Sequence, residues 1–314
     1  MTQFSIYPKL PISLWLIFSI AFLWACGSSN NTNTDAADTL QEQEKKQTKS
    51  INTPQKSPKI RKPGEIPFDF PKVNTSAKAR EFVLAPMLQW IEDGYTKGKD
   101  QMVLIFHSRE MIEPGAVESK LKAIGKEVMM PNSMIIPIPK GAKANKGDIL
   151  LTWEQNRGAS MRTAIVVNDA VPEKPKIQYL DTPYQPDQAS DQAQANSFTV
   201  LREAWQPGTY LAVKSSVGYD YAQVVRVVEQ KVLTVGFTGK IKVYDKKDCV
   251  PVPIRIDANP GDKVQVVKIA SFRNGIVKHV SPEIGRITVE IEFGGKPQEI
   301  VVGYGKVTKG LALD

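Results

Sequence analysis

The chain has 314 residues, a formal net charge of +8 and 41% hydrophobic residues, which is enough apolar material for two or three domains. Its 21 glycines and 22 prolines favour a turn-rich β protein over a helical bundle. The two cysteines and two histidines are too few for a disulfide framework or for a zinc site built from these residues.

Residues 1–25 have the pattern of a signal peptide. Lys9 precedes an apolar run at residues 12–25, and no acidic residue lies before or within that run. A helix needs roughly 20 residues to span the hydrocarbon core, so this shorter run suits a signal sequence better than a permanent span.

The run ends in Leu23-Trp24-Ala25-Cys26-Gly27, which resembles the lipobox of bacterial lipoproteins. In that motif an aliphatic residue, one further residue and a small residue precede the cysteine. The resemblance implies cleavage before Cys26 and a lipid on its thiol, whose chains contribute about 0.8 kcal/mol per buried methylene. An ordinary signal peptide with a chance cysteine and an uncleaved anchor remain as alternatives.

The same resemblance implies a location. We expect a membrane protein of the cell envelope, anchored by the lipid on Cys26. The residue after Cys26 is Gly27 and not an aspartate. This resembles the pattern of lipoproteins that are sorted to the outer membrane in some Gram-negative bacteria. In such a host, the outer membrane is therefore expected rather than the inner one.

Residues 26–75 are predicted to be a disordered tether. They are poor in large apolar groups and rich in Ser, Asn, Thr, Gln and Lys, so they cannot bury enough surface to offset the entropy of ordering. A basic cluster near the end of the predicted tether can contact anionic head groups, and each positive charge would contribute about 1 kcal/mol to binding. A solvated linker is the simpler interpretation. The cluster consists of Lys56, Lys59, Arg61 and Lys62.

Residues 76–204 are predicted to be an N-terminal α/β extension that includes a degenerate β-barrel repeat. A helix is expected from Ser76, its cap, through Asp93, with a kink at Pro86. Residues 102–106 and 134–138 read as strands packed on the first barrel. The degenerate repeat has strands at residues 146–153, 162–167 and 176–180, then a polar insert at 183–196 and a closing strand at 198–201.

Residues 205–258 and 259–314 repeat the same order of elements. Each consists of short alternating runs broken by glycine turns, a pattern typical of antiparallel strands with one buried face. Both contain a Phe-x-Gly-Lys turn before the last run. The runs lie at 207–213, 222–227, 232–237 and 241–244 in the first copy, and at 260–267, 275–280, 287–293 and 299–304 in the second.

These two copies resemble small β-barrels of the Tudor and Src-homology-like type. The resemblance rests on Pro-Gly-x-x-x-x-Val, on an aromatic before an Ala-x-Val-x-x-Val strand, and on a strand that ends in Gly-x-Phe. Tyr221 is that aromatic, and Asn274-Gly275 replaces it in the second copy. The resemblance implies a mainly β fold of tandem barrels and a cage for a methylated cation. The cage candidates are Tyr219, Tyr221, Phe237 and Tyr244, although aromatics in small barrels mostly pack in the core.

The sequence offers little support for catalysis. Cys249 can act as a nucleophile only beside a base, and a free cysteine is commonly a small buried hydrophobe. His107 ends an apolar strand and His279 alternates with valines, which fits structural roles. The polar insert and its border contain acidic residues predicted to be too loosely held for acid–base work, namely Asp181, Asp187 and Asp191.

The sequence therefore predicts a protein that is not an enzyme, with no catalytic residues, metal or cofactor. Its barrels are expected to bind a partner protein or an anionic envelope polymer. A peptidoglycan-binding accessory protein is the first alternative, and a cysteine-dependent enzyme is the second. Nucleic-acid binding is not expected because the basic residues are spread evenly along the strands instead of forming a stripe with stacking aromatics.

Overall fold

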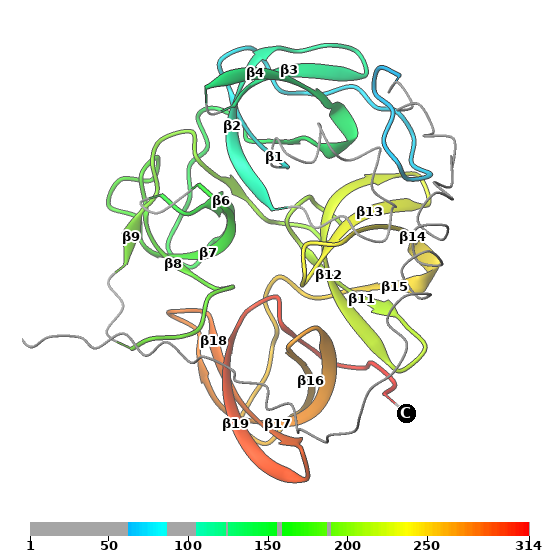
Figure 1. Cartoon of the computed structure of the whole chain (residues 1–314). Coiled ribbons are helices and arrows are strands. Elements are labelled where there is room, and N and C mark those ends of the chain that lie inside the picture. The colour runs from blue at the N-terminus through cyan, green and yellow to red at the C-terminus, as the bar shows by residue number, and fades with distance from the viewer. Residues whose placement is uncertain (1–61, 87–104, 124, 156–158, 187–189, 314) are drawn as a thin grey trace, which may run out of the picture. The chain divides into compact units, whose positions relative to one another are not determined.

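The computed structural model describes residues 62–86, 105–123, 125–155, 159–186 and 190–313 (Figure 1). Residues Lys56–Asp314 form one compact unit. The predicted signal peptide, Cys26 and most of the predicted tether lie outside the described residues. Within them the protein is mainly β, and its only helices are two short 3-10 turns. No described helix has the length and apolar character needed to cross a membrane.

The first sheet contains five antiparallel strands in the order β4-β3-β2-β1-β5. A 3-10 turn, η2, lies between β4 and β5. The elements are β1 (Phe82–Pro86), β2 (Phe106–Glu113), β3 (Glu118–Ala123), β4 (Lys126–Pro131), η2 (Asn132–Met134) and β5 (Ile136–Pro137).

The second sheet has the order β10-β6-β7-β8-β9, and all of its pairs are antiparallel. Its central strand, β7, is rich in β-branched residues and has four consecutive buried positions. The elements are β6 (Ile149–Trp153), β7 (Met161–Asn168), β8 (Lys176–Tyr179), β9 (Asp191–Gln192) and β10 (Thr199–Val200).

The third sheet has ten strands, and a single residue pair, Asp220 with Ser271, joins its two halves. The first half is β11 (Tyr210–Lys214), β12 (Tyr219–Val228), β13 (Lys231–Gly236), β14 (Ile241–Asp245), η3 (Lys246–Asp248) and β15 (Cys249–Pro251). The second half is β16 (Lys263–Lys268), β17 (Ser271–Ser281), β18 (Arg286–Phe293), β19 (Lys296–Gly303) and β20 (Val307–Thr308).

Four groups of five strands share one strand order. In each group the fifth strand pairs with the first, and the first, second, third and fourth strands then follow in sequence. We call these groups module 1 (β1–β5), module 2 (β6–β10), module 3 (β11–β15) and module 4 (β16–β20). Residues 76–140, which the sequence suggested were additions to a barrel, therefore contain a module of their own.

Each module has a bulge at the same point, where the second strand pairs with the third. The pairing register shifts between Met111 and Glu113 in module 1, and the other modules show the same shift at the matching place. A bulge adds one unpaired residue and bends the strand, which lets a short sheet curl over its apolar face. The other three shifts lie at Val166/Asn168, Val224/Arg226 and Val277/His279.

Each module also opens on the same turn. In module 3 the N–H of Gly208 donates to the carbonyl of Val224, and the N–H of Val224 donates to the carbonyl of Thr209. The glycine has a φ of 95°, a left-handed conformation that favours glycine. Arg80, Gly147 and Gly261 hold this position in the other modules, each with positive φ and the matching pair of hydrogen bonds.

The strands expected in modules 2, 3 and 4 are confirmed, but the helix from Ser76 to Asp93 is wrong where it can be checked. Phe82–Pro86 forms strand β1, and residues 87–104 lie outside the described part. Val83, Leu84 and Ala85 are all fully buried, so every side of the backbone faces protein. Pairing with β2 and β5 then satisfies the main chain, and such a continuous apolar run carries no period that separates strand from helix.

Three further expectations change. Residues 134–138 divide into the end of η2 and the two-residue strand β5, and of residues 102–106 only Phe106 lies in a described strand. Ile66 and Phe70, within the segment predicted to be a tether, are buried in the core. In the described residues the hydrogen-bonded strands form open sheets and no closed barrel, because the fourth strand does not pair with the fifth in any module.

The largest buried cluster of the molecule draws on all four modules. It includes Leu84, Leu151, Leu233 and Val289, one from each, and all four are fully buried. Burying a side chain of this size contributes about 1.5–3 kcal/mol. The modules therefore stabilise one another through a shared core, and this sharing brings distant polar residues together.

Candidate ligand-binding pocket

A pocket of about 510 Å³ lies against module 3, where all four modules contribute to its wall. Strands β11, β12 and β13 and the turn after β13 form one side. The pocket combines aromatic and charged side chains, a composition common in ligand sites. The lining residues used below are Phe106, Arg162, Asp181, Tyr221, Phe237 and Lys306.

Module 4 holds the segment that carries Asp181. The guanidinium of Arg286, which is 3% exposed, donates from Nη1 to the carbonyls of Leu180 and Thr182 at 3.2 Å each, and from Nη2 to the carbonyl of Tyr179. Lys306 Nζ donates to the carbonyl of Asp181 at 3.2 Å. Four consecutive carbonyls of module 2 thus accept hydrogen bonds from two cations of module 4.

The backbones of the two modules also approach closely at this point. A Cβ on Gly303 would stand 2.3 Å from the carbonyl oxygen of Leu180, so only glycine fits there. A Cβ on Gly305 would similarly stand 2.6 Å from the ring of Tyr210. These contacts make the position of Asp181 a property of the packed modules. The sequence-based expectation that Asp181 is loosely held is therefore wrong.

Asp181 lies in a half-buried cluster of charges. Its Oδ2 is 3.6 Å from Arg162 Nη1, and its Oδ1 is buried with no hydrogen-bond partner among the described residues. Burial raises the pKa of Asp181, and the charges of Arg162 and Lys306 oppose that shift. Burial also lowers the pKa of Lys306, because taking an ammonium group out of water disfavours its charged form.

Arg162 connects this cluster to a second acid. Its Nη2 is 3.3 Å from Oε2 of Glu154, while Nη1 faces Asp181. The remaining nitrogen, Nε, is buried and has no hydrogen-bond partner among the described residues. Arg162 therefore bridges two carboxylates, and only one of its five N–H donors makes a hydrogen bond among the described residues.

Two stacked tyrosines form the base of the pocket. The rings of Tyr210 and Tyr221 lie 4.9 Å apart at an interplanar angle of 19°, and the Tyr210 hydroxyl shares a 2.9 Å hydrogen bond with Thr163 Oγ1. Burial raises the pKa of Tyr221 well above its usual range, so its hydroxyl stays protonated. At the rim, Phe237 is 60% exposed.

The four aromatic residues predicted to form a cage do not all line this pocket. Tyr221 and Phe237 do. Tyr219 packs on the buried cluster around Tyr210 and Phe272, and Tyr244 packs on the cluster that contains Leu211 and Cys249. Burial raises the pKa of Tyr244 to about 12.

The other residues considered for chemistry are not among the lining residues of the pocket. Cys249 is a buried free cysteine, and burial together with Asp248 and Asp245 raises its pKa to about 11, so its thiol is protonated near neutral pH. His107 is in β2, and His279 is exposed on β17. Asp191 begins β9, and Asp187 lies outside the described residues. No group of three or more His, Cys, Asp and Glu side chains in the described part is placed to hold a metal ion.

Arg162, Arg286 and Lys306 were not recognised from the sequence as members of a site. The available signal was weak: Arg162 and Arg286 each interrupt or open a run that is otherwise apolar and β-branched. Nothing local connects them, because Asp181 and Lys306 are 125 residues apart in the chain.

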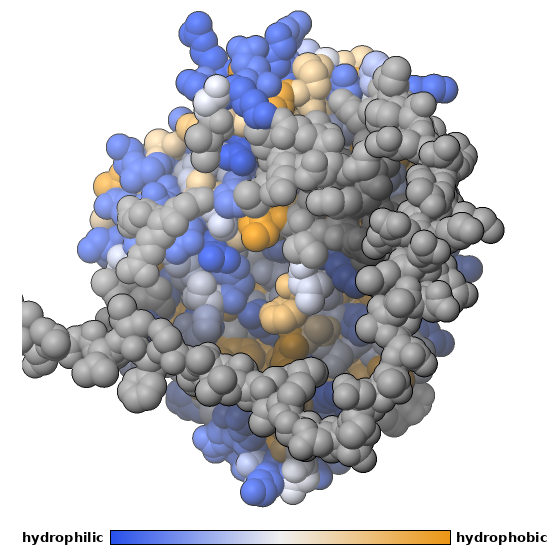
Figure 2. All heavy atoms as spheres, viewed as in Figure 1, coloured by the Kyte–Doolittle hydropathy of each residue, from blue (hydrophilic) through white to orange (hydrophobic). Residues whose placement is uncertain are grey.

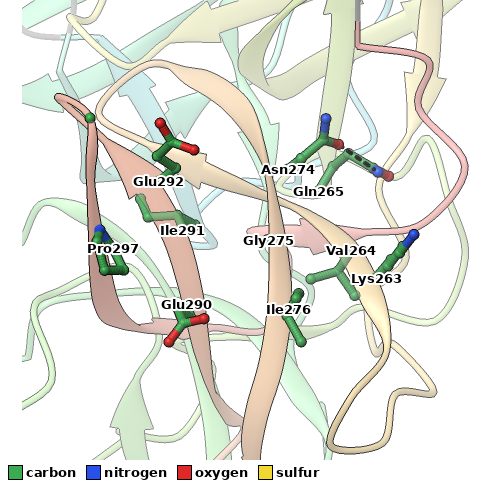
Figure 3. A pocket seen from close by; sticks show the side chains of 11 residues that line it. Lys263, Val264, Gln265, Asn274, Gly275, Ile276, Glu290, Ile291, Glu292 and Pro297 are labelled. Atoms are coloured by element: carbon green, nitrogen blue, oxygen red, sulfur yellow. Dashed lines mark hydrogen bonds between the residues drawn. The ribbon is translucent and has the colours of Figure 1, made fainter.

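Modules 1 and 4 have pockets at the matching position. Each lies where the second and third strands pair just before the bulge, at Glu110 with Lys122 in module 1 and at Ile276 with Glu290 in module 4. Figure 3 shows the module 4 pocket, of about 760 Å³, with polar side chains around a floor of strands. The residues around it include Gln265, Asn274 and Glu292.

Most of the coloured surface in Figure 2 is hydrophilic, with small separate hydrophobic patches. Many charges of the described residues are exposed and paired within a sheet, as in Lys278 with Glu290 at 3.1 Å. Such pairs contribute little to stability and mainly keep the outer faces soluble. The pocket of module 3 differs from these exposed pairs, because its charged side chains are largely withdrawn from water.

No protein-family model matches this chain, and no curated protein matches it either. The pocket of module 3, with its buried charges and exposed aromatic rim, is therefore the basis on which a function can be assigned.

Proposed function

We propose that this chain is a non-enzymatic, lipid-anchored protein of the cell envelope that binds a partner protein or an envelope polymer. The lipobox-like sequence before Cys26 supports the anchor and the location. A tether of polar residues after it would hold the packed modules away from the membrane surface.

The modules favour a Tudor-like and Src-homology-like architecture in which each small sheet curls but stays open between its fourth and fifth strands. Four copies of one strand order, each with a bulged second strand, support that assignment. In modules 1 and 3 a 3-10 turn also precedes the last strand. Folds of this size serve many functions, so the fold supports binding only in combination with the pocket.

The observation that carries the proposal is the pocket of module 3. All four modules contribute to it, its polar groups are positioned by hydrogen bonds from buried cations, and an exposed aromatic ring stands at its rim. A pocket so positioned is suited to holding a ligand. Its one carboxylate, Asp181, faces cations and has no histidine or cysteine beside it, which favours binding over catalysis.

The anchor is tested by labelling cells with a fatty-acid analogue. The wild-type chain is expected to take up the label and to fractionate with membranes, and Cys26→Ala is expected to lose both properties. Cys249→Ala is the matched control, because it removes the other cysteine without touching the lipobox. Label on the Cys26→Ala chain would contradict the proposal.

Binding in the pocket is tested by replacing its rim. Phe237→Ala should reduce recovery of the envelope ligand in a co-sedimentation assay with envelope fractions. Phe293→Ala is the matched control, since Phe293 holds the same position in the Phe-x-Gly-Lys turn of module 4 and is also exposed. Equal loss in both variants would remove the pocket of module 3 from the proposal.

Peptidoglycan is a second candidate ligand. An exposed aromatic ring next to a carboxylate and a guanidinium suits a polymer of sugars and short peptides, since sugar rings stack on aromatics and hydroxyls bond to both charges. Purified sacculi that sediment the wild-type chain, and sediment Phe237→Ala less, would favour this candidate over a protein partner.

A further inference from the structure

We propose that the pocket of module 3 binds a singly charged carboxylate group of its ligand, with Lys306 and Arg162 as the donors and Phe237 against the apolar part. The inference rests on the proposed binding function and specifies the chemistry of the group that is bound.

The cationic side chains of the pocket have hydrogen-bond donors that no described residue uses. An ammonium group has three N–H donors, and Lys306 uses one of them on the carbonyl of Asp181. A guanidinium group has five N–H donors, and Arg162 uses one of them on Oε2 of Glu154, while its Nη1 stands 3.6 Å from Oδ2 of Asp181. On the acceptor side stands Asp181 Oδ1. A ligand that brings oxygen acceptors satisfies more of this wall than one that brings donors.

The net charge of the pocket also favours an anionic ligand. Three cations, Arg162, Arg286 and Lys306, are close enough to act on the Asp181 carboxylate, and Arg162 also pairs with Glu154. Counting these five groups leaves one positive charge without a counterion. One carboxylate neutralises that charge, whereas a doubly charged phosphate would overshoot it.

The rest of the wall suits an apolar body. Tyr221 and Phe106 are buried, and the exposed ring of Phe237 stands beside the turn that contains Gly239. A methylated cation, the ligand suggested by the aromatic residues alone, would have to enter against Lys306 and Arg162. The pocket therefore favours the opposite sign of charge.

The test uses the detergent-solubilised full chain and isothermal titration calorimetry with three small probes. The probes are 3-phenylpropanoate, its neutral amide and 2-phenylethyl phosphate. We expect the carboxylate to bind roughly tenfold more tightly than the amide, because a charge-assisted hydrogen bond replaces a neutral one. Equal binding of acid and amide, or tighter binding of the phosphate, would overturn the proposal.

Variants then locate the bound group. Lys306→Met is expected to reduce carboxylate affinity by about tenfold while leaving the weak amide binding unchanged, and Lys306→Arg should restore most of the loss. Phe237→Ala should weaken acid and amide alike, and Phe293→Ala should change neither. Unaltered carboxylate binding in Lys306→Met would assign the bound group to another site.

Failure of this inference is separable from failure of the proposed function. If no probe binds, but the wild-type chain still sediments with envelope fractions in a Phe237-dependent manner, the carboxylate assignment is wrong and binding in the pocket stands. If the Phe237 dependence is also absent, both are wrong.

Discussion

Modules 3 and 4 differ in their pockets although their backbones follow one plan. Both have the same strand order, the same bulge and the same opening turn. In module 3, Tyr210 and Tyr221 stand where module 4 has Lys263 and Asn274. The other modules contribute to the wall of the first pocket, and the second is lined by module 4 alone.

The difference teaches how a repeated fold acquires a specific site. The backbone plan supplies a concave position in modules 1, 3 and 4, and the side chains and neighbours decide which charges it contains and how far they are buried. Charges interact strongly only where water is excluded, so the same residue types have greater effect in module 3 than on the open face of module 4.

The largest expected effect concerns the contact between Arg286 of module 4 and the segment that carries Asp181. Arg286→Met removes three hydrogen bonds to buried carbonyls, and we expect it to lower the free energy of unfolding by about 3–5 kcal/mol. Urea unfolding followed by circular dichroism measures this. Arg273→Met, at an exposed position on β17 of the same module, is the control and should change little. A loss below about 1 kcal/mol for Arg286→Met would mean that the segment around Asp181 is held by other contacts.

The opening turns provide a second and smaller contrast. Gly208→Ala and Gly261→Ala place a Cβ at nearly the same φ, 95° and 94°. The Cβ at residue 208 would stand 2.7 Å from the side chain of Leu151, whereas the one at residue 261 meets nothing within 4 Å. We expect about 1–2 kcal/mol of backbone strain in both variants, and about 1–3 kcal/mol more in Gly208→Ala. Thermal unfolding measures the difference, and equal losses would show that module 2 can move away from module 3.

The smallest expected effect is a dependence on pH that belongs to module 3. The folded-state pKa of Asp181 is raised above its ordinary value of 3.8, so between these two values the folded chain binds more protons than the unfolded chain. Stability therefore falls as pH rises through that window and levels off above the raised pKa.

Asp181→Asn removes this contribution, and the difference between wild type and variant in urea titrations at several pH values measures it. Asp262→Asn, in the opening turn of module 4, should show the opposite sign, because hydrogen bonds lower the pKa of Asp262. The same sign in both variants would contradict the electrostatic description of the module 3 pocket.

Sequence reasoning located most strands of modules 2, 3 and 4, because alternating apolar residues and glycine turns are local signals. It missed module 1, where Arg80 takes the place of the turn glycine and a run of fully buried residues at Val83, Leu84 and Ala85 removes the alternation. The turn at Gly125-Lys126 resembles that at Gly239-Lys240, which was a usable sign of the extra copy.

The candidate site was predicted only in part. Tyr221 and Phe237 were identified from the aromatic pattern, and both line the pocket. Asp181 was assigned to a loose insert, since neither its charge nor its neighbours in sequence reveal that Arg286 and Lys306 hold it.

By itself, the sequence determined the β-rich character of the chain and the position of most turns, because each depends on residues close together in the chain. Tertiary structure alone decided which modules share a core and which cations of module 4 hold the segment of Asp181, since these last contacts join residues more than 100 positions apart, 106 for Arg286 with Leu180. The physical reason is that a strand records its own burial pattern in its side chains, whereas the partner of a buried charge depends on how separate sheets pack.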